Sequence, residues 1–248
     1  MKYMDIHSHL LPGIDDGARD FEISMEMFRI AEKNGIGAMI LTPHYKPMHH
    51  NASPATIRRL IGEIEERLKE EEIEIRLYPG NEIYYHSEAV SQALEGRLCT
   101  MAGSSYVLVE FNPMDEFEYI RNGLYQFLAE GFRPVLAHVE RYRCMTGKAD
   151  RTEELTGMGA YIQVNAGSIM GRYGLQTKMF TRGLLKRKAV HFVATDAHDT
   201  KNRAPELSEC ARFLVKKFGE NYTRELLYEN PMKLVQNEYI YAFGQRET

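Results

Sequence analysis

The chain has 248 residues, a hydrophobic fraction of 44% and a formal net charge of -4. This composition is typical of a soluble globular protein, long enough for one large α/β domain or two small ones. The slightly acidic balance argues against nucleic acid as the main partner, because such proteins carry a basic surface. No stretch approaches the roughly 18 consecutive apolar residues that span a bilayer, and the polar start MKYMDIHSH lacks the features of a secretory leader.

The three cysteines, Cys99, Cys144 and Cys210, are odd in number and far apart in the sequence. We therefore expect reduced thiols in a cytoplasmic protein that is not an integral membrane protein. None of these cysteines begins the C-x5-R motif of thiolate phosphatases, since Arg151 lies one residue too far from Cys144. The sequence argues against a cysteine-based phosphatase.

Short apolar runs alternate with segments of helical periodicity along the whole chain. We predict strands over residues 3–6, 38–42, 73–78, 106–110, 134–137, 161–165 and 192–195. We predict helices over residues 21–34, 57–71, 117–130, 182–188, 205–218 and 222–228. Strand and helix alternating about seven times predict parallel strands with helices packed outside. No Pro-, Gly- or Ser-rich linker divides the chain, so we expect a single domain over residues 1–248.

The segment DIHSHLLPGIDDGA, residues 5–18, follows the first predicted strand. His7 and His9 are alternate residues, so in an extended segment they share a face and can bind one cation together. Asp15 and Asp16 follow within the same segment. Imidazole and carboxylate groups in one small volume suit a divalent transition metal. The alternative is a pair of unrelated surface histidines, which the rest of the chain disfavours by repeating the pattern.

Further histidines and acids lie at or just after the ends of other predicted strands. The candidate metal ligands are His7, His9, Asp16, His44, Glu82, Glu110, His138, Asp196 and His198. In a parallel β/α barrel the carboxyl ends of the strands meet on one face, where barrel enzymes keep their active sites. A lone polar residue at a strand end is more often capped or solvated, but a whole set on one face favours a shared metal centre.

The motifs DIHSHLLPGIDDGA, LTPH, GNE, LVEF, AHVERY and TDAH occur in this order between Asp5 and Arg203. Through them the chain resembles the PHP (polymerase and histidinol phosphatase) superfamily. More narrowly, it resembles the bacterial manganese-dependent protein tyrosine phosphatases of capsule and exopolysaccharide operons. The resemblance implies an α/β fold, a distorted (β/α)7 TIM-like barrel.

The resemblance also implies three divalent metal ions and assigns the ligands of each. The first set is His7, His9, Glu82 and Asp196; the second is a bridging Glu82 with Glu110 and His138; the third is Asp16, His44 and His198. Manganese is expected through the resemblance, although mixed histidine and carboxylate ligands also accept iron or zinc. Asp5 is expected to orient a histidine rather than bind metal.

The expected reaction is attack of a metal-bound hydroxide on the phosphorus of a phosphate ester, since metal binding lowers the pKa of water to about 7. Arg141 in HVERY and Arg203 after TDAHDTKN match arginines of the family and are expected to clamp the phosphate. A tyrosine phenol needs little protonation as it leaves, and either His198 or a metal-bound water could assist. The resemblance implies as substrate the phosphotyrosine tail of a partner tyrosine kinase that regulates capsular or extracellular polysaccharide synthesis.

Three alternatives stay open. The first is a phosphatase of the same fold that acts on a small phosphomonoester such as histidinol phosphate. The second is a PHP nuclease, which would need a basic track that this composition does not supply. The third is a non-catalytic metal-binding scaffold, although structural zinc sites are often rich in cysteine and this ligand set has none. Nothing in the sequence specifies an oligomeric state.

Overall fold

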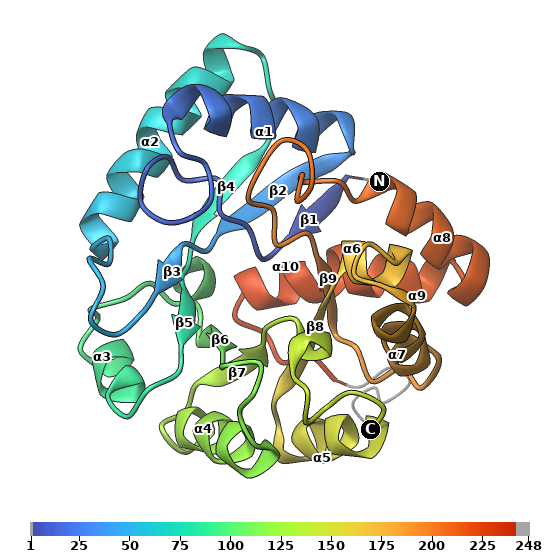
Figure 1. Cartoon of the computed structure of the whole chain (residues 1–248). Coiled ribbons are helices and arrows are strands. Elements are labelled where there is room, and N and C mark those ends of the chain that lie inside the picture. Colours follow the sequence, from blue (N-terminus) through green and yellow to red (C-terminus); the bar gives the residue numbers. More distant parts are fainter. Residues whose placement is uncertain (1, 242–248) are drawn as a thin grey trace.

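The computed structural model describes residues 2–241, in which parallel strands form a ring inside a layer of helices (Figure 1). The strands are β1 (Tyr3–Asp5), β2 (Ile36–Leu41), β3 (His44–Tyr45), β4 (Arg76–Pro79), β5 (Glu82–Tyr84), β6 (Tyr106–Glu110), β7 (Arg133–Leu136), β8 (Tyr161–Asn165) and β9 (Phe192–Ala194). They form two sheets, with the orders β1-β2-β4 and β3-β5-β6-β7-β8-β9. Every strand pair is parallel, as the alternating sequence pattern predicts.

Two members of the ring are interrupted strands. In the first, Pro43 lies in the break between β2 and β3, and in the second, Gly80 lies in the break between β4 and β5. The two parts pair separately, β2 with β4 and β3 with β5. Proline has no N–H group to donate to a sheet, so Pro43 suits such a break. Counted this way the ring has seven members, and a parallel bridge between Ser8 and Ala197 joins its first and last. The predicted distorted (β/α)7 barrel is confirmed.

The third predicted strand is misplaced. The prediction covered residues 73–78, whereas β4 begins at Arg76, which pairs with Ala38 of β2. Ile73 and Ile75 are buried without belonging to a strand. Their alternation with polar residues therefore reports burial alone, because alternate residues of any extended segment face the same side.

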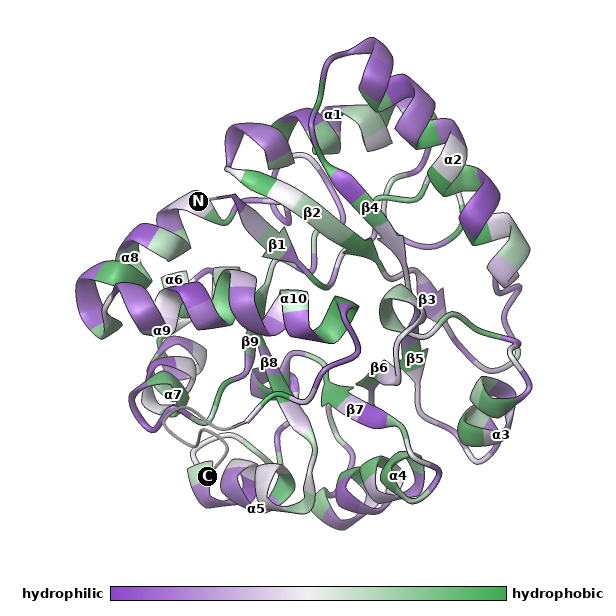
Figure 2. Ribbon diagram, turned by 180° about the vertical axis from the view of Figure 1, so that it is seen from behind, coloured by the Kyte–Doolittle hydropathy of each residue, from purple (hydrophilic) through white to green (hydrophobic). Residues whose placement is uncertain are grey.

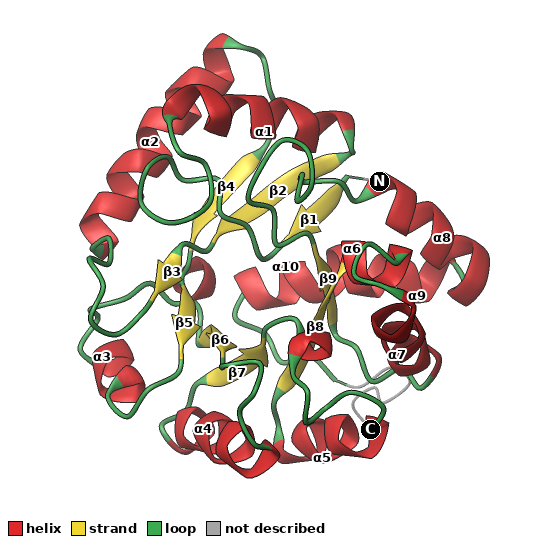
Figure 3. Cartoon of the chain, in the orientation of Figure 1, coloured by secondary structure: helices red, strands yellow, loops and turns green. Residues whose placement is uncertain are grey.

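The helices surround the ring (Figure 3). They are α1 (Phe21–Lys33), α2 (Pro54–Glu70), α3 (Ala89–Leu94), α4 (Phe117–Ala129), α5 (Ala149–Met158), α6 (Ala166–Met170), α7 (Leu175–Lys186), α8 (Ser208–Phe218), α9 (Glu220–Arg224) and α10 (Asn230–Val235), with the π-helical turn η3 (Glu225–Glu229) before α10. The side chains of Asp20 and Ser53 cap α1 and α2 by accepting hydrogen bonds from backbone N–H groups of the first turn. The prediction missed α3, α5, α6 and α10.

Apolar side chains pack on both sides of the strand ring. One cluster fills the barrel interior and includes Met4, Leu108 and Leu234, the last from α10. A larger cluster lies between the strands and the outer helices. Seen from behind, α10 crosses the barrel (Figure 2), so the opposite face, where the strands end, is left for polar side chains. No helix in residues 2–241 is both long and apolar enough to cross a membrane.

Gly123 of α4 lies against a tightly packed aromatic pair. A Cβ atom there would come within 2.8 Å of the Phe111 ring and 2.9 Å of the Tyr85 ring. We predict that Gly123→Ala lowers the free energy of unfolding by about 1–3 kcal/mol through overpacking. Gly62 of α2 is the matched control, because a Cβ atom at that position would have open space for 4 Å around it. Gly62→Ala should raise stability by about 0.5–1 kcal/mol in urea unfolding, and equal effects of the two changes would contradict the packing argument.

Candidate metal centre

All nine predicted ligands lie around one basin at the carboxyl ends of the strands. They form four overlapping groups, within each of which the donor atoms lie within 4.8 Å of one another: His9, Asp16, His44 and His198; His7, His9 and Glu82; His7, His138 and Asp196; His44, Glu82 and Glu110. Because the groups share members, they form one connected cluster. The third predicted set, Asp16, His44 and His198, falls within a single group.

The loop that follows β1 brings His7 and His9 into the basin. Their Nε2 atoms lie 3.3 Å apart, as expected for alternate residues that share a face. The loop then folds back so closely that a Cβ at Gly17 would lie 2.0 Å from the carbonyl oxygen of His9. Only glycine fits this approach, which explains the glycine of the IDDGA motif and places Asp15 and Asp16 beside the histidines.

Two side chains orient the histidine rings of this loop. The Nδ1 atom of His9 lies 2.7 Å from Asp15 Oδ2, and that of His7 lies 3.2 Å from Gln163 Oε1. An amide oxygen only accepts hydrogen bonds, so His7 donates from Nδ1 and turns Nε2 towards the basin. Contacts of this kind fix the ring and tautomer of metal-binding histidines.

Asp5 has a different role from the expected one. It accepts hydrogen bonds from the backbone N–H groups of Thr195 and His7, at 3.0 and 3.3 Å, and from the Thr195 hydroxyl. In the described chain it bonds to no histidine ring, so the expectation that it orients one is wrong. Asp5 instead ties the end of β1 to the end of β9, and burial raises its pKa to about 6.

Glu82 lies at the centre of the cluster. Its oxygens are 2.8–3.3 Å from ring nitrogens of four histidines: His138, His44, His9 and His7. Burial would raise the pKa of Glu82, but the surrounding histidines hold it well below its usual value. Neighbouring Glu110 has its pKa raised to about 7 by burial and by the Glu82 charge. This central position agrees with the bridging role predicted for Glu82.

Asp196 uses its two carboxylate oxygens differently. Oδ2 lies 2.6 Å from Arg141, 2.8 Å from Arg203 and 2.9 Å from the Asn165 amide nitrogen. Oδ1 faces the ring of His7 at 3.4 Å. One oxygen is thus fixed by cationic and amide donors, and the other is directed towards the imidazoles.

Backbone geometry at two strand ends supports this placement. His138 has φ 33° and Asp196 has φ 54°, both in the left-handed region that non-glycine residues seldom adopt. A non-glycine residue in this conformation lowers the free energy of unfolding by about 1–3 kcal/mol, and such residues often mark a functional site. These turns follow β7 and β9 and direct both side chains into the basin.

The electrostatic environment differs among the histidines. Burial disfavours a charged ring, but the carboxylates of Asp15 and Glu82 outweigh it at His9 and raise the pKa to about 10. At His138, burial and the charge of Arg141 lower the pKa to about 4. The acids of the basin therefore favour a proton on the His9 ring, which a bound cation would displace, whereas the His138 ring is already neutral, as a metal ligand must be.

The donor atoms of the basin fit metal ions. Three of them are buried and have no partner in hydrogen-bond geometry within residues 2–241: His44 Nδ1, Glu110 Oε2 and Asp196 Oδ1. A buried polar atom left unpaired costs about 1–3 kcal/mol, so a group that binds such atoms is stabilising. Nitrogen and carboxylate oxygen are donors that zinc, iron and manganese accept.

Both predicted phosphate-binding arginines lie at the edge of the basin. Arg141 ends the short helix η2 (Val139–Arg141) directly after His138, and its side chain is 30% exposed. Arg203 lies in the loop after β9 with its side chain 27% exposed, and its carbonyl oxygen accepts a hydrogen bond from the backbone N–H of His198. Both guanidinium groups can therefore meet a ligand that enters from solvent.

Two polar residues of β8 belong to the site but were not predicted from the sequence. Gln163 contacts His7, and Asn165 contacts Asp196. The Gln163 amide nitrogen also donates to the Asn165 side-chain oxygen at 2.7 Å, which joins the two contacts. The signal was present in the sequence, because these alternate residues place two amides on one face of an otherwise apolar strand.

Comparison with known proteins agrees with this site. The sequence matches the family described as Capsular polysaccharide synthesis, CpsB/CapC, over residues 3–236. It is 35% identical over 239 residues to the tyrosine-protein phosphatase YwqE of Bacillus subtilis (strain 168), covering 96% of this chain and 93% of that protein. It is 29% identical over 242 residues to the tyrosine-protein phosphatase CpsB of Streptococcus pneumoniae, covering 96% of this chain and 100% of that protein.

Solved structures give the same result. The fold matches a structure described among those of YwqE from Bacillus subtilis and CpsB from Streptococcus pneumoniae, unique metal-dependent tyrosine phosphatases, with TM-score 0.90, 34% identity and 96% of each chain covered. A histidinol phosphate phosphatase from Lactococcus lactis, complexed with zinc, L-histidinol and phosphate, matches with TM-score 0.56 and 16% identity over 87% of this chain and 93% of that one, which shows a shared fold alone. With a family match over residues 3–236, this chain belongs to the CpsB/CapC family of capsular polysaccharide synthesis.

Proposed function

We propose that this protein is a metal-dependent tyrosine-protein phosphatase. The observation that carries the proposal is the convergence of nine histidine and carboxylate ligands with two arginines around one basin. Relatives that share up to 35% of the sequence over nearly its whole length are tyrosine-protein phosphatases. Ligand residues run from His7 to His198, so we propose one catalytic domain built from the whole chain, of which residues 242–248 lie outside the described part.

Three divalent cations would be held by the sets proposed from the sequence. They are His7, His9, Glu82 and Asp196; Glu82, Glu110 and His138; and Asp16, His44 and His198. The third set lies within one of the four groups, and the first two are each divided between two groups. When bound, the cations supply an activated water as nucleophile and neutralise charge on the phosphoryl group. Manganese remains our proposal for the metal, and the mixed nitrogen and oxygen donors are compatible with it.

The arginines bind and orient the phosphoryl group in this proposal. A guanidinium group presents a planar fork that matches two phosphate oxygens, and its charge stabilises the transition state. Asp196 holds Arg141 and Arg203 at the same carboxylate oxygen, so both reach the same part of the basin. The phosphotyrosine ring would then point outward as the phenolate leaves.

His198 fits the ligand role better than proton delivery. Its Nδ1 atom lies 2.9 Å from the carbonyl oxygen of Asp196, so Nδ1 carries the proton of the neutral ring. Nε2 faces Asp16 at 3.5 Å and is the nitrogen left to bind a cation. We therefore propose that a solvent water protonates the phenolate, which needs little help because the phenol pKa is near 10.

The proposed substrate is the phosphotyrosine tail of a bacterial tyrosine kinase that regulates polysaccharide synthesis, in the cytoplasm. Membership of a capsular polysaccharide synthesis family supports this context. The main alternative is a small phosphomonoester such as histidinol phosphate.

We expect kcat/KM on a phosphotyrosyl peptide to exceed that on histidinol phosphate by at least about 100-fold in manganese-loaded protein. A preference for histidinol phosphate would overturn the proposal, and failure to hydrolyse even p-nitrophenyl phosphate would favour a metal-binding scaffold.

Substitutions should separate metal binding from phosphate binding. We predict that His7→Ala and Arg141→Ala each lower kcat by about 100-fold or more, the first through loss of metal and the second through loss of charge stabilisation. Metal content, measured by elemental analysis after gel filtration, should fall mainly in His7→Ala. Arg141→Lys should recover little activity, because an ammonium group cannot bind two phosphate oxygens in a fork.

The contact between Asp15 and His9 should affect metal affinity. Asp15→Asn removes the charge that orients the His9 ring and should weaken metal binding about 10- to 100-fold in a titration. Asp20→Asn is the control, because asparagine caps α1 as well as aspartate does and Asp20 lies outside the basin. Unchanged affinity in Asp15→Asn would show that the ring needs no such support.

A further inference from the structure

Two neighbouring cavities lie between Arg141 and the exposed side of α7. One cavity of about 620 Å³ is lined by Arg141, Arg143 and Tyr173 among others. A second cavity of about 650 Å³ is lined by apolar side chains of α7 and by the loop before α5. Thr146 and Gln176 line both cavities, so the two lie side by side. We call this combined surface the α7 groove.

The far end of the α7 groove is apolar and exposed. Leu175 is 70% exposed and Met179 is 66% exposed, and they lie one helical turn apart on the same helix face. Gly183 continues this row, and a Cβ added there would meet nothing within 4 Å. Large apolar side chains grouped at the surface mark binding sites more often than chance exposure does.

The near end of the α7 groove carries two arginines, and the one acidic side chain in its lining, Glu140, is buried. Arg141 lies at its junction with the metal basin, and Arg143 is exposed two residues further on. No acidic side chain pairs with Arg143 in the part of the chain that the structure describes, whereas Arg187, which lines the second cavity, pairs with Asp150 and Glu153. The chain has a net charge of -4, so this unpaired arginine beside the basin is a local feature.

We propose that the α7 groove binds the peptide that flanks the phosphotyrosine. An acidic residue close to the phosphotyrosine would face Arg143, and one large apolar side chain further along would lie against Leu175, Met179 and Gly183. The exposed Arg143 at one end, the apolar surface at the other, and the position of Arg141 in both the cavity and the basin support this assignment. It depends on the proposed function, since it assigns a recognition surface to the same catalytic site.

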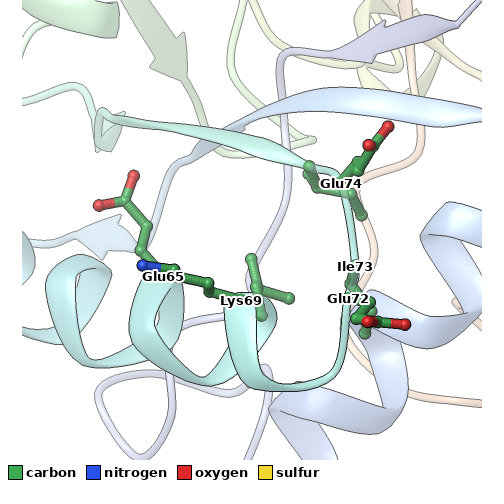
Figure 4. A pocket seen from close by; sticks show the side chains of 7 residues that line it. Glu65, Lys69, Glu72, Ile73 and Glu74 are labelled. Carbon is green, nitrogen blue, oxygen red and sulfur yellow. The ribbon is translucent and has the colours of Figure 1, made fainter.

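Another cavity supplies a matched control surface. It has about 640 Å³, lies at the end of α2 and is lined by residues that include Glu65, Lys69 and Glu72. Figure 4 shows Glu65 and Lys69 on the helix and Glu72 on the turn that follows. Its lining includes neither Arg141 nor any other residue of the metal basin. Lys69→Glu therefore changes the charge as Arg143→Glu does, at a cavity of similar size that is separate from the site.

The test compares phosphotyrosyl peptides with p-nitrophenyl phosphate, which is too small to reach the groove. In a set of serine-rich peptides, one leucine is moved through the five positions on each side of phosphotyrosine. We expect one or two positions to lower KM by about tenfold, as burial of a leucine allows. Gly183→Leu, which fills the groove, should abolish this preference for leucine. Arg143→Glu should raise KM about tenfold for a peptide that has an acidic residue next to the phosphotyrosine. Hydrolysis of p-nitrophenyl phosphate by both variants should change less than twofold.

The outcomes separate the two proposals. If wild-type protein hydrolyses neither substrate, the proposed phosphatase function fails. If it hydrolyses both, and Gly183→Leu and Arg143→Glu behave as Lys69→Glu does on every peptide, the groove proposal alone is overturned. If Gly183→Leu instead changes the mass in sedimentation without changing any KM, the groove is a self-association surface and the proposal is likewise overturned.

Discussion

The parallel bridge between Ser8 and Ala197 is the contact on which the metal basin depends. It joins the first and last members of the strand ring, and the backbone N–H of His9 donates to the Ala197 carbonyl oxygen at 2.9 Å. Each of these bridging residues lies between two ligand residues, His7 and His9 on one side and Asp196 and His198 on the other. Because alternate side chains of an extended segment share a side, the bridge turns His7 and His9 together towards the segment that carries Asp196 and His198. The left-handed backbone at Asp196 then directs its side chain into the same basin. Closure of the barrel and assembly of the centre are therefore one structural event.

The two interrupted strands extend the same principle to the other side of the ring. β3 and β5 pair so that His44 lies opposite Glu82, which brings an imidazole and the central carboxylate together through backbone register alone. At the second break, a Cβ on Gly80 would lie 2.9 Å from Ile40 and 3.1 Å from Thr42, so glycine lets the chains pass closely. The register is the same on both sides of the breaks, since Leu41 lies opposite Pro79 and His44 lies opposite Glu82. The two breaks therefore preserve the pairing that brings the imidazole and the carboxylate together.

The sequence predicted most of the strands, and the convergence of the candidate ligands on one basin, because each depends on local pattern. Apolar runs mark strands, and acids and histidines after them mark the site whatever their distance along the chain. Orientation of the rings was not predictable in this way. The contact between Gln163 and His7 joins residues that are 156 positions apart. Asp15, and not Asp5 as expected, contacts a histidine ring, because the turn at Gly17 folds the chain back onto His9. The start of α7 was missed because Leu175 and Met179 are exposed, which breaks the apolar period that predicts a helix.

Asp196 links the two halves of the proposed chemistry. Two guanidinium groups at one carboxylate oxygen would repel each other without its charge, and burial of that carboxylate would be costly without them. These neighbours, with the histidines, hold the pKa of Asp196 well below its usual range despite burial. The oxygen directed at the imidazoles therefore stays ionised, as a metal ligand must. An incoming phosphate can share the arginine N–H groups that do not face Asp196, since each guanidinium has five donors. The same carboxylate thus sets both the ligand charge and the position of the phosphate-binding groups.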